Sequence, residues 1–478
     1  MRRLRADLPA AGAVPAVAAC ASGALVAVAW SGPRTAQWPF AAGVDDLVRW
    51  QSAQSTATTV GQLLAVVVAA LFLAVAGRAR RLPWILAVVA IVLLAFTKVA
   101  IPQSASLSVL IALHGVKSVS AGVLLGLALH GVRRSRLGWF ALATGLLGGT
   151  ALAVVSTRAT TDGFVALRID SSSVFGEPAW WLVGAAVAAA VAASVVPGPD
   201  QRRTESVPDA PDVPNRDLLR LTVYAVLVAV VCRVGVEVVG TGEYSLAVAI
   251  TALVVALVVI DRVAARWDAP DARTVVATVL ATTAAVASWN TLARTASSVT
   301  VLLAVGLVGL VVGALAAWLL PVGRVASWIA AVALAAAPAA ASLLDVEPAP
   351  AVALGVVAVA LPVLLVGVAG SPGSHHPDRP PAFPHAPHPT VRPLALALPG
   401  FALLLSTAAP VPRQVIDFEL AESLGASISQ SDDGTGSVSL LGYNSLDTLL
   451  TVDPTSTYLL LGVSAVAVLR LVTLSRRG

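Results

Sequence analysis

Charged residues are scarce in this sequence. Asp, Glu, Lys and Arg make up only 12% of its 478 residues, whereas apolar residues make up 57%, and the mean hydropathy is +0.86. Soluble globular domains contain about 25% charged residues, because their surface must be solvated by water. The composition therefore excludes a soluble globular chain and predicts an integral membrane protein.

Residues and motifs that would indicate other chemistry are also missing. The two cysteines, Cys20 and Cys232, both lie in apolar runs, where packing is a better interpretation than redox chemistry. The sequence has no glycine-rich phosphate loop ending in Gly-Lys-Ser or Gly-Lys-Thr, no His-x-x-x-His pair in an apolar run and no paired aspartates at the outer end of a helix. We therefore expect no enzyme activity, no catalytic residues, no metal and no cofactor.

Apolar runs long enough to cross a bilayer recur along the whole chain. A membrane helix needs about 17 to 25 residues to cross roughly 30 Å of hydrocarbon. Charged residues, glycine and proline bound these runs and predict an all-α polytopic protein with fourteen transmembrane helices. The predicted spans are 13–30, 57–76, 83–102, 106–130, 137–156, 179–197, 218–239, 245–260, 274–291, 298–320, 325–344, 350–369, 393–409 and 457–474.

Basic residues set the expected orientation of these spans. Most of the 31 Lys and Arg residues fall in alternate loops, as in the clusters 78–81 and 133–136, or at the ends of the chain, including Arg470 and Arg476. Cytoplasmic loops are enriched in Lys and Arg, so both termini are expected in the cytoplasm and the protein in the plasma membrane. This distribution also explains the net charge of +5 without a nucleic-acid partner.

Three longer polar segments interrupt the apolar runs, at 198–217, 370–392 and 410–456. The first is rich in Pro, Asp and Arg and predicts a flexible cytoplasmic linker. The second contains a histidine cluster, but its many prolines favour a solvated linker over a metal site; the histidines are His375, His376, His385 and His388. The third is acidic and is expected outside, and its Ser- and Gly-rich part, 425–439, predicts a partly mobile cap.

Ionisable residues inside the predicted spans are the best candidates for function, because each costs about 2.5–3.5 kcal/mol to insert. Lys117 lies near the middle of the fourth span, and His114 shares its helical face together with Ser118 and Ser120. This face is either a substrate or proton-linked site or a set of structural hydrogen bonds between helices.

The other candidates have simpler structural interpretations. Lys98 is close to the outer end of the third span, where a lysine side chain can reach the membrane surface. Arg233 and Glu237 are four residues apart on the seventh span, a spacing that favours a structural ion pair within the helix over a substrate or proton pathway.

The arrangement of spans resembles the 14-helix drug/proton antiporter branch of the major facilitator superfamily. The features that carry the resemblance are the number of spans, a long first outer loop (31–56) and the long outer segment 410–456. The basic turn 76–81, the stretch 114–118 and the glycine-rich stretch 144–149 lie where that family has motifs, although the first lacks the family's aspartate and the last its proline. The glycines of 144–149 also permit close helix packing.

The resemblance implies a domain organisation. It predicts an amino-terminal six-helix bundle (1–197), the cytoplasmic linker 198–217, an inserted helix pair (218–268) and a carboxy-terminal six-helix bundle (269–478). It implies a secondary transporter, an exporter of a small molecule, with the lipid bilayer, the substrate and protons as partners.

Charge narrows the expected cargo. The ionisable groups deep in the amino-terminal bundle are all basic, and Glu237 is the only deep acid in the chain. We therefore expect an anionic or neutral polar cargo, with His114 as the proton-responsive group. The alternative is a non-transporting membrane scaffold or cell-envelope assembly protein whose outer segment binds a partner.

Overall fold

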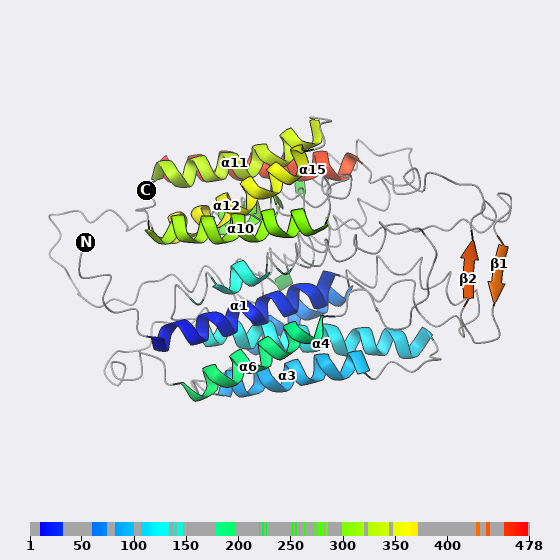
Figure 1. Ribbon diagram of the computed structural model, residues 1–478. Helices are drawn as coiled ribbons and strands as arrows, with labels where there is room; N and C mark the ends of the chain where they lie inside the picture. Colours follow the sequence, from blue (N-terminus) through cyan, green and yellow to red (C-terminus); the bar gives the residue numbers. More distant parts are fainter. Residues whose placement is uncertain are drawn as a thin grey trace.

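The computed structural model of the chain describes a set of helices and one short strand pair (Figure 1). Helical residues are also described at scattered positions between 138 and 149 and between 219 and 284. The continuous described segments are 10–31, 60–73, 82–99, 107–132, 178–196, 299–319, 324–343, 348–370, 427–430, 436–439 and 454–476.

Helices form at the predicted apolar runs, with ends within a few residues of those expected. Their bounds are α1 (Ala10–Ser31), α3 (Leu82–Val99), α4 (Leu107–Val132), α6 (Trp180–Val195), α10 (Val299–Leu319), α11 (Arg324–Leu343), α12 (Ala349–Gly370) and α15 (Pro454–Arg476). The second predicted span contains the helix Val60–Leu73. The fifth is helical at 141–146 and 149, and the seventh, eighth and ninth at scattered positions, whereas 393–409 lies outside the described residues. The all-α prediction is confirmed for these helices.

Large apolar side chains face outward from helices in both halves of the chain. In α3 the residues Leu82, Ile85, Val89, Val92, Phe96 and Val99 are exposed, while the buried residues include Ala87 and Ala90. In α10 the exposed residues include Val301, Leu307, Val308, Val311 and Leu315. Exposed residues that recur every three or four positions form one continuous apolar face on a helix.

Glycine allows very close packing between α1 and the fifth predicted span. A Cβ added to Gly145 would collide with the backbone of Cys20, and one added to Gly149 would lie 2.6 Å from Cα of Ala24. A Cβ on Gly23 would in turn lie 2.6 Å from the carbonyl oxygen of Leu142. The interpretation of 144–149 as a close-packing stretch is confirmed, because only glycine lets the two backbones approach this closely.

Similar crossings join two other helix pairs. In α4, a Cβ on Gly122 would collide with the carbonyl oxygen of Ala65, and one on Gly126 would lie 2.8 Å from that of Ala69. In α10, a Cβ on Gly309 would lie 3.1 Å from the carbonyl oxygen of Gly355 in α12, and Gly313 lies against the backbone of Val359. In each of these helices the two glycines are four residues apart, so both face the same neighbour.

These contacts also give the relative direction of the helices. In each glycine crossing, residue numbers rise together on both helices, so the first and fifth spans, the second and fourth, and the tenth and twelfth run parallel. By contrast, Trp84 at the start of α3 lies against Gly131 at the end of α4, so α3 and α4 are antiparallel. The parallel pairs are an even number of predicted spans apart and the antiparallel pair is consecutive, the pattern expected of helices that alternate in direction.

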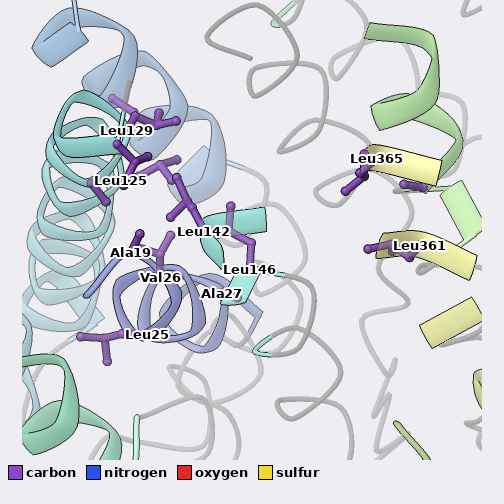
Figure 2. Packing of buried hydrophobic residues seen from close by; sticks show 14 of the residues in the cluster. Ala19, Leu25, Val26, Ala27, Leu125, Leu129, Leu142, Leu146, Leu361 and Leu365 are labelled. Carbon is purple, nitrogen blue, oxygen red and sulfur yellow. The ribbon is translucent and has the colours of Figure 1, made fainter. Parts of the chain in front are cut away.

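The larger contacts between helices fall into two groups. In the first, α1 packs against α4 and α6, and α3 packs against the same two helices. In the second, α12 packs against α10 and α11, and α11 also contacts α15. Buried apolar residues of both groups belong to one cluster, of which Figure 2 shows the part around α1. There Leu142 and Leu146 of the fifth span lie beside Val26 and Ala27 of α1 (Figure 2).

A short β-hairpin lies within the acidic segment 410–456. Strands β1 (Ser427–Gln430) and β2 (Gly436–Ser439) pair antiparallel, with Ser427 opposite Ser439 and Gln430 opposite Gly436. The Ser- and Gly-rich composition of 425–439 predicted a partly mobile cap here and no strands. Figure 1 shows the hairpin beyond one end of the helices.

Two described helical stretches are long and apolar enough to cross a membrane by length and composition, Leu82–Val99 and Ile111–Val132. Several shorter apolar helices accompany them. Arg470, counted among the basic residues near the carboxy terminus, lies inside α15, as the predicted span 457–474 implies, and Thr473 donates a hydrogen bond to its carbonyl oxygen (2.8 Å). Only Arg476 is at the end of that helix.

Candidate functional site

A buried polar face on α4 is the main candidate site. Lys117 is only 2% exposed and is the largest of the fully buried side chains among the described residues. Ser118 and Ser120 are buried beside it, and His114 is half-buried one turn earlier. The sequence predicted that these residues share an inward face. The structure places that face inside the first group of helices.

The second predicted span holds His114 and Ser118 in place. Gly61, near the start of Val60–Leu73, faces both residues: a Cβ added there would collide with Nε2 of His114 and lie 2.6 Å from Oγ of Ser118. The glycine crossings one and two turns later, at Ala65 and Ala69, keep the two backbones close along this interface. The imidazole therefore occupies space that is available only because residue 61 has no side chain.

Two further polar residues were missed by the sequence analysis. Gln62 is buried next to Gly61, and Ser22 is buried near the middle of α1, which packs against α4. The hydroxyl of Ser22 has no hydrogen-bond partner in the described structure. The available signal was a polar residue in the interior of an apolar run. This signal is weaker than that of an ionisable residue, because a neutral polar side chain costs less to insert.

Lys98 has a different environment from Lys117. Its Nζ donates a hydrogen bond to the carbonyl oxygen of Pro178 (2.9 Å) and lies 4.9 Å from the centroid of the Trp180 ring. These contacts join the last turn of α3 to the first turn of α6. Lys98 therefore does not belong to the polar face of α4, although both were candidates for one pathway.

The described structure contributes basic groups only. Among the residues that the structure describes there is no Asp and no Glu, and the ionisable residues other than Cys and Tyr are Lys98, His114, Lys117, His130, Arg262, Arg273, Arg324, Arg470 and Arg476. Arg233 and Glu237, the proposed ion pair of the seventh span, lie outside the described residues.

Polar contacts in the second group of helices are structural. Ser464 of α15 donates a hydrogen bond to Oγ1 of Thr283 in the ninth predicted span (2.9 Å), and Thr283 in turn bonds the carbonyl oxygens of Val279 (3.1 Å) and Leu280 (2.9 Å). The two hydroxyl groups thus find their hydrogen-bond partners within and between these two helices. It offers no charged group to a ligand.

Metal ligands do not cluster in the part of the chain that the structure describes, where no group of three or more His, Cys, Asp or Glu could hold an ion. The four histidines of 370–392 lie outside it. No protein-family model matches the chain, and no curated protein matches it.

Substituting Gly61 tests whether the imidazole of His114 packs against this residue. We expect Gly61→Ala to lower the free energy of unfolding by about 1–3 kcal/mol, because the new methyl group must displace the imidazole or separate the helices. The matched control is Gly115→Ala on α4, where an added Cβ meets nothing within 4 Å. Thermal unfolding of the purified proteins in one detergent measures both. Equal stability of the two variants would show that His114 is not held by Gly61.

Proposed function

We propose that this chain is a polytopic membrane protein that works as a secondary transporter, an exporter of a small anionic or neutral polar molecule. The proposal places the polar face of α4 near the middle of the bilayer, inside an amino-terminal six-helix bundle. It keeps the likeness to the 14-helix antiporter branch as a hypothesis about architecture. The observation that carries the proposal is the burial of Lys117.

Membrane embedding is supported by the outward faces of the helices. Exposing the Val, Leu, Ile and Phe side chains of α3 and α10 to water would be unfavourable. Soluble monomers rarely expose apolar patches of this extent. In lipid such faces are stable. The glycine crossings also fit, because membrane helices associate through small residues that let their backbones approach.

The proposed topology has fourteen spans with both termini in the cytoplasm. The arginine-rich loops support it, because they fall on one side only if every predicted span crosses. The alternating directions of the described helices agree with consecutive crossings within each half of the chain. The hairpin β1–β2 lies beyond the helix ends, as the proposed outer position of 410–456 requires (Figure 1).

A buried lysine in the middle of a membrane helix needs a reason to persist. Inserting a charged side chain at mid-membrane costs about 2.5–3.5 kcal/mol, and a leucine at the same position would have no such cost. A hydrogen bond between membrane helices contributes about 0.6–2 kcal/mol, less than this cost, so structural stability alone does not favour retaining Lys117. Binding a substrate does, because an ammonium group at low dielectric attracts an anion or a strong hydrogen-bond acceptor much more strongly than in water.

His114 gives the site a group that can respond to protons. Histidine is the side chain whose ordinary titration lies near neutral pH. It is one turn from Lys117 on the same helix, so a proton on the imidazole and an anion beside the ammonium would influence each other electrostatically. We therefore propose protons as the coupling ion.

Flux measurements in proteoliposomes test this proposal. We expect vesicles containing the protein to take up radiolabelled organic anions or neutral polar solutes when a pH gradient is imposed, and empty vesicles not to do so. Ethidium, a lipophilic cation, should not be transported, because the site is basic. Proton-driven ethidium transport that depends on this chain would contradict the charge argument.

The alternative is a membrane scaffold or envelope assembly protein. The β-hairpin within 410–456 favours it, because each strand of this two-stranded sheet pairs on one edge only, and a free strand edge can bind a partner strand. The flux experiment separates the two proposals: a scaffold would move neither class of solute at any pH gradient.

A further inference from the structure

Lys98 lies at the end of α3, where its described contacts are with neutral groups only. Its ammonium group is held between two neutral groups, the carbonyl oxygen of Pro178 at 2.9 Å and the face of the Trp180 ring at 4.9 Å. An ammonium has three N–H donors, and the carbonyl uses one of them. No carboxylate occurs among the described residues of either helix. The positive charge is therefore fixed in place but not neutralised by these contacts.

Exposed aromatic and apolar side chains surround Lys98 on the outer surface of the helices. Trp180 is 55% exposed and Trp181 is 65% exposed at the start of α6, although an indole ring has a large apolar surface. Phe96 and Val99, on either side of Lys98 in α3, are also exposed. Tryptophan is enriched where membrane proteins meet lipid headgroups, because its ring is apolar and its N–H is a hydrogen-bond donor.

We propose that Lys98, Trp180 and Trp181 form a binding site for the phosphate of an anionic phospholipid headgroup. The free donors of the ammonium bind phosphate oxygens, the indole N–H groups provide further donors, and the acyl chains cover Phe96 and Val99. This inference rests on the membrane embedding in the proposed function but not on transport.

A lipid fits this site better than a soluble anion does. Inorganic phosphate would satisfy the ammonium group but would make no apolar contact with the two indole rings and Phe96. A phospholipid satisfies the charge and covers the apolar surface at once. The position also separates this site from the proposed substrate site, because Lys98 is in the last turn of its helix and Lys117 is near the middle of α4.

Lipid retention tests the inference. The full chain is reconstituted in nanodiscs of phosphatidylglycerol and phosphatidylcholine, released into mild detergent and analysed by native mass spectrometry. We expect the wild type to retain phosphatidylglycerol in preference to phosphatidylcholine. Lys98→Gln should lower this preference about fivefold, the contribution of one lysine near an anionic surface, while its amide still donates to the Pro178 carbonyl. Lys98→Arg should keep the preference.

Controls define the outcomes that would overturn the inference. Arg324→Gln removes another cation at a helix end, the first residue of α11; an equal loss there would mean that general charge, and not this site, holds the lipid. An unchanged preference in Lys98→Gln would exclude the site. Displacement of the lipid by millimolar inorganic phosphate would identify a soluble anion as the ligand. Failure of the wild type to enter nanodiscs would instead refute membrane embedding, and with it both proposals.

Discussion

Gly145→Ala should lower the free energy of unfolding by about 1–3 kcal/mol. Elsewhere in a helix the same change would stabilise the protein by about 1 kcal/mol, because alanine is the better helix former. At position 145 the added methyl group meets the backbone of Cys20, including its carbonyl carbon at 2.8 Å. Backbone atoms cannot rotate away as a side chain can, so α1 must move. Chemical or thermal unfolding in detergent measures the change.

The chain offers a matched control for this effect. Gly184 lies in α6, and a Cβ added there meets nothing within 4 Å. Gly184→Ala should therefore be neutral or slightly stabilising. Gly145→Leu should prevent folding into the native bundle, which protease resistance in membranes would detect. If Gly145→Ala is as stable as Gly184→Ala, the close crossing between α1 and the fifth span is not present.

Lys117→Leu should abolish most transport while the protein still folds into the membrane. An interaction of substrate with a charged group contributes about 1.5–3 kcal/mol, so flux should fall by about tenfold or more. The free energy of unfolding should fall by no more than about 1–3 kcal/mol, the cost of leaving a polar group inside the bundle without its partner. Proteoliposome flux and the melting temperature of the same preparation measure the two effects separately. Lys117→Arg, which keeps the charge, should retain part of the flux.

A second basic residue on the same helix provides the control. His130 is buried in the last turn of α4, about 20 Å along the helix from Lys117. His130→Leu should leave flux unchanged if the site is local. A large loss of stability in Lys117→Leu, with flux lost in proportion, would mean that Lys117 has a structural role.

Individual residues show what could be predicted about the site. His114, Lys117, Ser118 and Ser120 were expected on one inward face of a helix, and the structure confirms that Lys117 and both serines are buried. Helical periodicity alone supports this, because residues three and four apart share a face. Lys98 was a separate candidate, as an ionisable residue near the outer end of another span. The sequence could not reveal its contacts with the Pro178 carbonyl and the Trp180 ring, which lie about 80 residues further along the chain.

The sequence by itself determined the helices. Long apolar runs bounded by charge, glycine and proline leave the backbone no alternative to internal hydrogen bonding in an apolar environment, so local composition decides where each helix begins and ends. The two strands within the acidic segment were not predicted from the sequence, because strand pairing depends on contacts between 427–430 and 436–439 and not on composition.

Only the tertiary structure decided which helices pack together. Gly145 and Gly149 indicate that another backbone packs closely against this helix. Their spacing does not predict which backbone it is, namely that of Cys20 and Ala24 in α1. The reason for a glycine at position 61 is likewise visible only in the structure, where it leaves space for His114, more than fifty residues away. Packing between helices is a property of paired surfaces, and one helix read alone contains only half of each pair.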